Sequence, residues 1–160
     1  MEYIKKMHSI PNIESLRGNI RGKKVFLRAD FNVPIHNGKI TDTYRIDATM
    51  QTFAFLKEEG AITIVVSHIE TKDVESPTLV PVFLYLVEKY PQYTVYFCDS
   101  FLNRSDVETC LNAAKEGEFV LFENIRRADK VGMSEKLNDI KLAEYFKSFV
   151  EFYIEDAFVV

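Results

Sequence analysis

Polar and charged side chains close each of the five most apolar stretches of this sequence. These side chains are Arg28, Asp30, Asn32, Ser67, His68, Cys98, Asp99, Glu123, Asn124, Arg126 and Asp156. If the stretches are parallel strands, their carboxyl ends meet at one edge, where open α/β sheets bind their ligands. Arginine and histidine at such an edge are suited to a small anion, because they donate charge-assisted hydrogen bonds. The pattern therefore predicts an anion site at the carboxyl edge of a parallel sheet.

Three of these residues share one face of a strand. Arg28, Asp30 and Asn32 alternate with apolar residues over 23–33, and side chains two positions apart point the same way. The carboxylate and the amide can hold a hydroxylated, charged metabolite by hydrogen bonds. Alternatively, Arg28 and Asp30 neutralise each other and have only a structural role.

Arg45 and His68 are further candidates. Arg45 lies in the first turn of a helix predicted over 44–59, where the helix dipole disfavours a cation. Either Asp42 or Asp47 compensates this charge locally, or Arg45 serves an anion bound beside the helix terminus. His68 directly follows an apolar strand, where it is either a structural histidine or part of the same site.

Two arginines, Arg126 and Arg127, follow the fourth strand, and one is expected to face the crevice while the other faces solvent. The alternation of side chains does not decide between them. The sequence has no metal-ligand spacing of paired Cys or His, no glycine-rich phosphate loop, and no Ser or Cys nucleophile beside a plausible base. The sequence predicts anion binding by side chains, but neither a metal site nor nucleotide binding by this chain.

The bulk composition is that of a globular domain. The chain has 160 residues, 47% of them hydrophobic, and a formal net charge of −4, which argues against general nucleic-acid binding. The two cysteines are too few for a disulfide framework and are expected to be reduced and partly buried. The apolar run 61–66 is far too short to cross a membrane, and residues 1–6 lack the apolar core of a signal peptide. We therefore expect a cytoplasmic domain with no membrane partner.

Strands and helices alternate along the predicted fold. Strands are expected over 23–33, 61–66, 93–98, 118–122 and 151–157, and helices over 44–59, 77–90, 104–115 and 138–150. An Asn-Gly turn within 36–39 predicts a small hairpin, Thr41 and Asp42 can cap the first helix, and 69–76 reads as a loop. A polar connection is expected through Gly132 and Ser134. The second helix is expected to point Leu79, Val82, Phe83, Leu86 and Val87 inward. This order predicts one domain of the α/β class, a doubly wound Rossmann-like parallel sheet in three α-β-α layers.

Five segments, in order along the chain, also resemble one enzyme family. They are VFLRADFNVP (25–34), GKITDTYRI (38–46), VSH (66–68), LFENIR (121–126) and EDAF (155–158). Together they closely resemble the signature segments of phosphoglycerate kinases, with a match extending over about 10–158. The resemblance implies glycolytic, reversible phosphoryl transfer between 1,3-bisphosphoglycerate and ADP, which gives 3-phosphoglycerate and ATP.

In that family an N-terminal domain binds 3-phosphoglycerate or its bisphosphate, a C-terminal domain binds Mg-ATP or Mg-ADP, and a hinge closes the two together. By position in the motifs, Asp30 and Asn32 correspond to residues that bond the hydroxyl and carboxyl end of the substrate. Arg45 corresponds to the catalytic residue nearest the transferred phosphoryl group, where electrostatic stabilisation dominates the chemistry. The resemblance also implies that His68 and Arg126 hold the distal phosphate and that Arg28 is a supporting residue, paired with a carboxylate.

The sequence departs from the family pattern in two places. The family continues Ser-His with Leu-Gly-Arg-Pro, but here Glu70 and Thr71 follow Ile69, so an arginine is lost and a negative charge is added. Lys72 is a less rigid substitute for that arginine. After the motif at 155–158 the family continues into a helix start with His and Arg, the hinge and the nucleotide domain. This sequence instead has only Val159 and Val160 after that motif.

We therefore expect residues 1–160 to form a single 3-phosphoglycerate-binding domain that binds no cofactor itself and is inactive alone. Mg-ATP or Mg-ADP is expected only with the nucleotide domain. Two alternatives remain open. The chain is a non-catalytic phosphate- or carboxylate-binding module, or it is half of a split enzyme that needs a separate nucleotide-domain chain. An exposed apolar end is also compatible with dimerisation.

Overall fold

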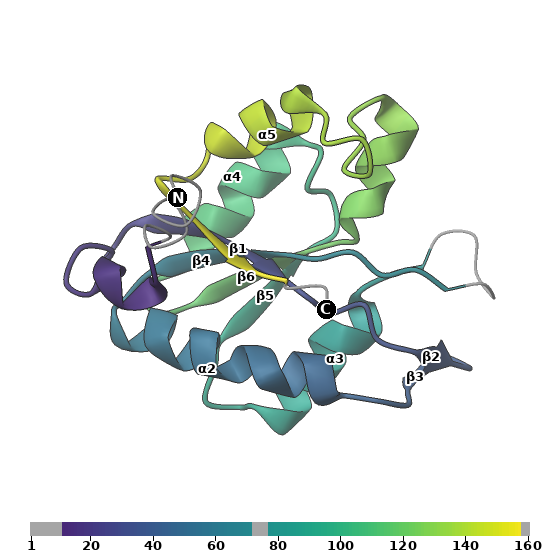
Figure 1. The fold of residues 1–160 in the computed structure, drawn as a ribbon, viewed down its shortest axis with the longest axis horizontal. Helices are drawn as coiled ribbons and strands as arrows, with labels where there is room; N and C mark the ends of the chain where they lie inside the picture. Colours follow the sequence, from purple (N-terminus) through teal and green to yellow (C-terminus); the bar gives the residue numbers. More distant parts are fainter. Residues whose placement is uncertain (1–10, 72–76, 158–160) are drawn as a thin grey trace, which may run out of the picture.

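The structure is a computed structural model that describes residues 11–71 and 77–157, so the predictions for Lys72 and Phe158 lie outside the described residues. Its centre is a five-stranded sheet in the order β5-β6-β4-β1-β7 (Figure 1). The strands are β1 (Lys24–Ala29), β4 (Ile62–Val66), β5 (Val95–Cys98), β6 (Phe119–Phe122) and β7 (Phe152–Asp156). Every neighbouring pair in this sheet is parallel, as the alternation of strands and helices predicts.

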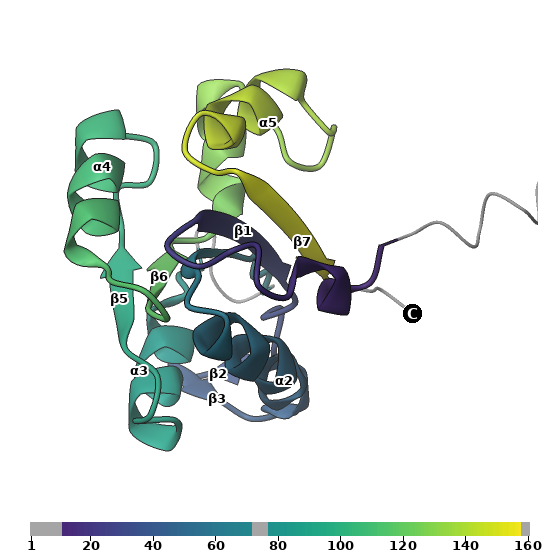
Figure 2. The ribbon, with the colours of Figure 1, turned by 90° about the vertical axis from the view of Figure 1, so that its left-hand side faces the viewer.

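Helices cover both faces of the sheet. On one face lie α2 (Tyr44–Glu58) and α3 (Val80–Lys89), and on the other lie α4 (Arg104–Ala113) and α5 (Ile140–Lys147), as Figures 1 and 2 show. The chain also contains two 3₁₀ segments, η2 (Ile13–Leu16) and η3 (Ile125–Val131). The predicted doubly wound, three-layer α/β fold is confirmed.

The core consists of two apolar clusters, one on each face. Val25 and Leu27 of β1 belong to the cluster under α2 and α3, whereas Phe26 belongs to the cluster under α4 and α5. This division follows from the period of two along a strand. The ring centroids of Phe53 and Phe119 lie 4.2 Å apart in a stacked arrangement, which joins α2 to β6. The inner strands β1, β4 and β6 are therefore mostly buried on both faces, whereas the edge strand β7 is partly exposed.

Strand β1 ends at Ala29, four residues before the predicted end at Val33. The backbone leaves the ladder because the Phe31 N–H donates to Ser67 Oγ at 2.9 Å and the Val33 N–H donates to the Phe31 carbonyl at 2.9 Å. Asp30 therefore lies in an irregular segment at the carboxyl edge of the sheet. Such segments can aim polar side chains at a ligand more freely than a strand can.

Helix α3 is shorter than predicted, since it begins at Val80 rather than residue 77. Leu79, Val82 and Leu86 are buried as expected, but Val87 is 45% exposed, so the prediction that it points inward is wrong. Val87 follows Leu86 by one position, about 100° around the helix, which turns it off the buried stripe. The cap of α2 also differs: its N-cap is Thr43, although Asp42 Oδ1 accepts the Tyr44 N–H at 2.9 Å.

The predicted hairpin is present as β2 (Ile35–His36) and β3 (Lys39–Ile40), an antiparallel pair. Asn37 and Gly38 at its turn have φ values of 50° and 73°, which suit an Asn-Gly turn. The polar connection expected through Gly132 and Ser134 is present as turn and irregular backbone, and it follows the 3₁₀ segment η3 (Ile125–Val131). Its N-cap is Asn124, whose side chain accepts the Arg126 N–H.

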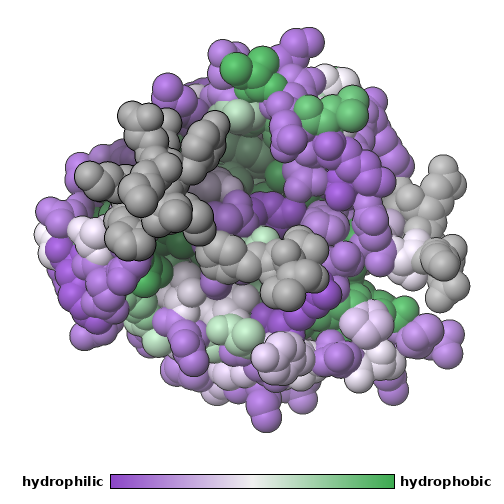
Figure 3. Space-filling model, viewed as in Figure 1, coloured by the Kyte–Doolittle hydropathy of each residue, from purple (hydrophilic) through white to green (hydrophobic). Residues whose placement is uncertain are grey.

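The molecular surface is largely hydrophilic on the face shown in Figure 3, with separate hydrophobic side chains near α5 at the top.

Both cysteines are free, with Cys98 buried. Burial, together with the neighbouring Cys110, raises the pKa of the Cys98 thiol to about 12, so it stays protonated at neutral pH. Within 11–71 and 77–157, no helix is both long and apolar enough to cross a membrane.

Candidate anion-binding site at the carboxyl edge

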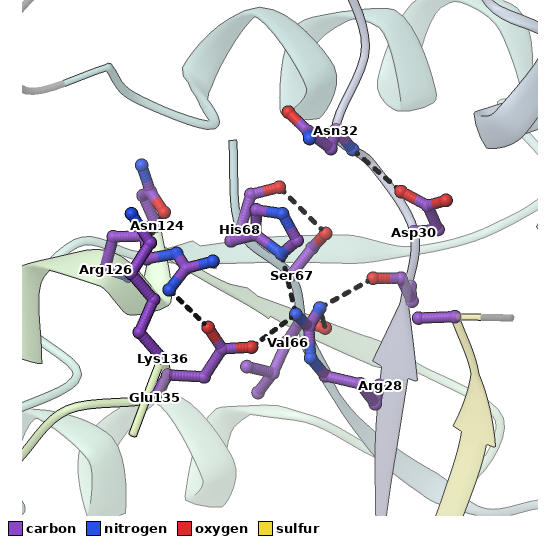
Figure 4. Close-up of polar contacts among 12 residues, drawn as sticks. Arg28, Asp30, Asn32, Val66, Ser67, His68, Asn124, Arg126, Glu135 and Lys136 are labelled. Carbon is purple, nitrogen blue, oxygen red and sulfur yellow. Dashed lines mark hydrogen bonds and ion pairs between the residues drawn. The ribbon is translucent and has the colours of Figure 1, made fainter. Parts of the chain in front are cut away.

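Residues at the carboxyl ends of β1, β4 and β6, and just after them, meet at the carboxyl edge of the sheet. Figure 4 shows Arg28 beside His68, Glu135 between Arg28 and Arg126, and Asp30 with Asn32 on the other side of His68. The central positions of β4 and β1 in the sheet explain this meeting, because their carboxyl ends are adjacent. The predicted gathering of these side chains is confirmed.

The Arg28 guanidinium is held by several partners. Its Nη2 donates to Glu135 Oε1 at 2.7 Å and lies 2.7 Å from His68 Nδ1, while Nη1 donates to the Ala29 carbonyl at 2.9 Å. Arg28 is thus paired with a carboxylate, as the family resemblance implies. That carboxylate is not Asp30, so mutual neutralisation of Arg28 and Asp30 is not what the structure shows.

Arg126 lies on the other side of Glu135. Its Nη1 is 3.0 Å from Glu135 Oε2 and its Nε is 3.3 Å from Glu70 Oε1, and its side chain is only 19% exposed. Both nitrogens are buried, yet neither makes a hydrogen bond of good geometry to any residue within 11–71 and 77–157. A buried guanidinium with unused donors gains free energy when an anion with suitably placed oxygens binds.

Asn124 fixes the two loops that surround Arg126. Its Nδ2 donates to the carbonyls of Ile69 and Pro77 at 2.8 and 2.9 Å, and its Oδ1 accepts the Ile69 N–H at 3.2 Å. The same Oδ1 accepts the Arg126 N–H at 3.2 Å. Asn124 therefore joins the segment after β4 to the start of η3, which places Arg126 at the site.

Glu123 is a buried carboxylate, only 2% exposed, that holds the start of α3. Its Oε1 accepts the N–H groups of Leu79 and Asn124 at 2.8 and 2.6 Å, and Oε2 accepts the Thr78 hydroxyl. Arg127 Nη2 lies 2.9 Å from Oε2. Of the two arginines after β6, Arg126 therefore faces the site and Arg127 neutralises Glu123.

Arg45 reaches the site from the first turn of α2. Its Nη1 donates to Asp30 Oδ2 at 2.8 Å, and half of its side chain is exposed. Asp47 does not compensate it, because that carboxylate accepts the hydroxyls of Tyr85 and Tyr90, each at 2.7 Å. Asp30 is the observed partner, so the interpretation that Asp47 neutralises Arg45 is wrong.

Asn32 connects Asp30 to the segment after β4. Its N–H donates to Asp30 Oδ1 at 3.2 Å, and its Oδ1 accepts the Glu70 N–H at 3.0 Å. The side-chain amide nitrogen of Asn32 is thus the group left to contact a ligand.

Cys98 and Asp99 do not join this cluster, because β5 is the edge strand two positions away from β4. Asp99 lines a separate pocket with Arg127 there.

His68 is half-buried beside two guanidinium groups. Burial lowers its pKa below the ordinary value of 6.5, and the charges of Arg28 and Arg126 lower it further. A guanidinium only donates hydrogen bonds, so His68 Nδ1 at 2.7 Å from Arg28 Nη2 must be the acceptor. The neutral ring then carries its proton on Nε2 and can donate it to an anion.

This assignment predicts an acidic titration of His68. An NMR titration of its ring protons is expected to give a midpoint below 6.5 in the free chain, and a higher midpoint with a bound phosphorylated anion. Because the unfolded chain titrates near 6.5, the stability contributed by this group is present above that pH and lost as the pH falls. A midpoint at or above 6.5 without ligand would contradict the assignment.

The charges of the cluster nearly balance. Its cations are Arg28, Arg45, Arg126 and Lys136, and its carboxylates are Asp30, Glu70 and Glu135. Among the residues the structure describes, no group of three or more His, Cys, Asp and Glu side chains can hold a metal ion. The four cations against three carboxylates leave the cluster with one excess positive charge, which suits a small anion.

Glu135 and Lys136 are site residues that the sequence analysis missed. They lie in a polar connection without periodicity, and Glu135 is 107 residues from its partner Arg28. Glu70, which the sequence marks as an added negative charge, contacts both Arg126 and Lys136. The sequence places more arginines than carboxylates at this edge of the sheet. Because buried charges are normally paired, this excess indicates that carboxylates from other segments must reach the site.

Comparison with known proteins gives a consistent result. Residues 13–160 match the family model for phosphoglycerate kinase. The chain is 36% identical over 145 residues to the phosphoglycerate kinase of Streptococcus equi subsp. zooepidemicus (strain MGCS10565), covering 88% of the chain and 36% of that relative. It is also 36% identical over 144 residues to that of Lactococcus lactis subsp. cremoris (strain MG1363), covering 87% of the chain and 36% of the relative.

Solved structures show the same fold. The crystal structure of phosphoglycerate kinase from Pyrococcus horikoshii OT3 superposes with a TM-score of 0.76 at 26% identity, covering 91% of this chain and 36% of that one. The structure from Coxiella burnetii gives 0.66 at 26% identity, covering 86% and 33%. The chain thus spans about a third of the length of these proteins. Because the family model covers nearly all of its residues, this chain belongs to the phosphoglycerate kinase family.

Proposed function

We propose that this chain is the part of a phosphoglycerate kinase that binds 3-phosphoglycerate or 1,3-bisphosphoglycerate. The observation that carries the proposal is the convergence of Arg28, His68 and Arg126 at the carboxyl edge, where Arg126 keeps buried donors without hydrogen bonds. A phosphoryl group offers several oxygens to such donors, and its charge suits a cluster of arginines.

The proposed roles divide the site along the substrate. His68 Nε2 and the Arg126 guanidinium would hold the distal phosphate, with Arg28 fixing the His68 ring from behind. Asp30 and the amide nitrogen of Asn32 would bond the hydroxyl and carboxyl end, since both lie where the chain leaves β1.

Arg45 would act nearest the transferred phosphoryl group. It is more exposed than Arg126, and its Asp30 partner holds the guanidinium at the mouth of the site. Phosphoryl transfer depends mainly on positioning and on stabilising negative charge in the transition state. An exposed arginine can meet a nucleotide phosphate that approaches from outside this chain.

The overall reaction would be reversible phosphoryl transfer between 1,3-bisphosphoglycerate and ADP, with the nucleotide bound as its Mg complex by a second domain. The match covers only 36% of these relatives, so their remaining length is ample for that domain. We expect the chain alone to bind the triose phosphate and to lack kinase activity. Adding a separately produced nucleotide domain and assaying ATP formation tests whether the two halves complement each other.

The binding claim is tested by isothermal titration calorimetry with 3-phosphoglycerate, sulfate and ATP. The expected result is saturable binding of 3-phosphoglycerate, clearly weaker binding of sulfate, and none of ATP. Equal affinity for sulfate and 3-phosphoglycerate would favour a general anion-binding module instead. Binding of ATP alone would contradict the proposal.

A further inference from the structure

The Glu70 carboxylate lies inside the proposed anion site with one oxygen between two cations. Its Oε1 is 3.3 Å from Arg126 Nε and 3.1 Å from Lys136 Nζ. Lys136 comes from the segment beside Glu135, and Figure 4 shows both near Arg126. Two cations converging on one oxygen is an arrangement that a phosphoryl oxygen can also take.

The two carboxylates at Arg126 differ in how firmly they are held. Glu135 is 22% exposed, bridges Arg28 and Arg126, and its N–H donates to Asp129 Oδ1 at 3.0 Å. Glu70 is 48% exposed, and its carboxylate pairs with Arg126 and Lys136 on the outer side of the cluster. Removing Glu135 would leave two guanidinium groups without their shared partner, whereas Glu70 can rotate into solvent. Glu70 is therefore the exchangeable anion.

The backbone of Glu70 is held by hydrogen bonds, although about half of its side chain is exposed. The Glu70 N–H donates to Asn32 Oδ1 at 3.0 Å, and the preceding Ile69 is bonded on both backbone groups by Asn124. The hydrogen bond from Lys136, opposed in part by burial, holds the pKa of the Glu70 carboxyl below its usual range. It is therefore ionised at neutral pH and competes with any anion that approaches Arg126.

We propose that Glu70 is an internal counter-anion that the distal phosphate of the ligand displaces, and that Lys136 then contacts that phosphate. This inference rests on the proposed function, because it concerns the same site. No covalent bond changes: the Glu70 carboxylate leaves Arg126 and Lys136, and phosphoryl oxygens take its place. Lys136 would supply the cation that the family has at the position of Thr71.

The exchange makes the site selective for doubly charged groups. A carboxylate that replaces Glu70 exchanges one single negative charge for another, so it gains little from Arg126 and Lys136. A phosphoryl group carries more charge and more acceptor oxygens, so it gains from both cations. The comparison of 3-phosphoglycerate with glycerate, which lacks the phosphate, measures how much the distal phosphoryl group contributes to binding.

The test uses Glu70→Gln and Lys136→Met with calorimetric titration of 3-phosphoglycerate and glycerate. Matched controls at the amino edge are Glu116→Gln, whose carboxylate lies 3.1 Å from Arg21, and Lys23→Met, whose Nζ lies 2.9 Å from Glu151. Glu70→Gln is expected to tighten 3-phosphoglycerate binding about three- to tenfold, the size of one partly screened charge contact. Lys136→Met is expected to weaken it by a similar factor, and the controls to leave it unchanged.

The double variant separates a ligand contact from a simple surface ion pair. If Lys136 contacts the phosphate, Lys136→Met weakens binding in the Glu70→Gln background as well. If Lys136 only pairs with Glu70, it has no effect there, and the inference is overturned. Unchanged or weaker binding by Glu70→Gln also overturns it while leaving the proposed function in place. Absence of binding by the wild type and every variant overturns both.

Discussion

Replacing Glu123 with alanine is expected to lower the free energy of unfolding by about 3 kcal/mol, because buried donors then lose their acceptor. The Leu79 and Asn124 N–H groups both donate to this carboxylate, and Arg127 Nη2 lies 2.9 Å from it. Each buried N–H left without a partner costs about 1–3 kcal/mol, which is more than the hydrogen bond itself contributes. The start of α3 and the loop that carries Arg126 would loosen together.

Urea unfolding followed by circular dichroism measures this loss. Glu123→Gln keeps an acceptor oxygen for the two N–H groups, so we expect it to lose clearly less than the alanine variant. Glu108→Ala is the control, because its carboxylate pairs with the exposed Arg104 on the surface of α4. A loss below about 1 kcal/mol for Glu123→Ala, close to that of an ordinary surface substitution, would contradict the role given to Glu123.

Replacing Arg126 with methionine is expected to weaken 3-phosphoglycerate binding more than about tenfold, the value of one charge-assisted contact with a phosphate. Methionine keeps much of the length of the side chain but has no donors and no charge. Arg126→Lys keeps the charge without the planar fork, so an intermediate loss is expected. Calorimetric titration of both variants gives the comparison.

The same experiment needs a check on folding, because Arg126 also contacts Glu135. Glu135 keeps its 2.7 Å contact with Arg28 in the variant, so the carboxylate is not left unpaired. Thermal unfolding would show that the variant is folded at the temperature of the titration. Arg104→Met, on the surface of α4, is the matched control and should bind normally. A folded Arg126→Met variant with wild-type affinity would contradict the site.

The sheet and its layers could be predicted because they depend on local patterns. Alternation along β1 places Val25 and Phe26 in opposite clusters, and the structure confirms this. The ends of elements depend on single long-range hydrogen bonds. The bond from the Phe31 N–H to Ser67 Oγ ends the β1 ladder early, and no property of residues 23–33 alone reveals it.

The site, like the fold, could be predicted where it depends on the order of the strands, but not where it depends on contacts between distant loops. Parallel strands bring their carboxyl ends together whatever the loops do, so Arg28, His68 and Arg126 could be placed at one edge. The carboxylates that neutralise them could not be assigned, because an ion pair depends on where a distant loop folds back. Glu135 is the clearest case, since its polar surroundings in the sequence resemble an ordinary surface loop.

The most direct test of the central claim is an NMR titration of the full chain with 3-phosphoglycerate, observing the arginine Nε–Hε signals. The account predicts saturable shifts for Arg126 and Arg45 with a single dissociation constant. Arg21, which pairs with Glu116 at the amino edge, should not move. Unchanged signals for Arg126 and Arg45 at saturating ligand, or shifts confined to Arg21, would contradict an anion site at the carboxyl edge of this sheet.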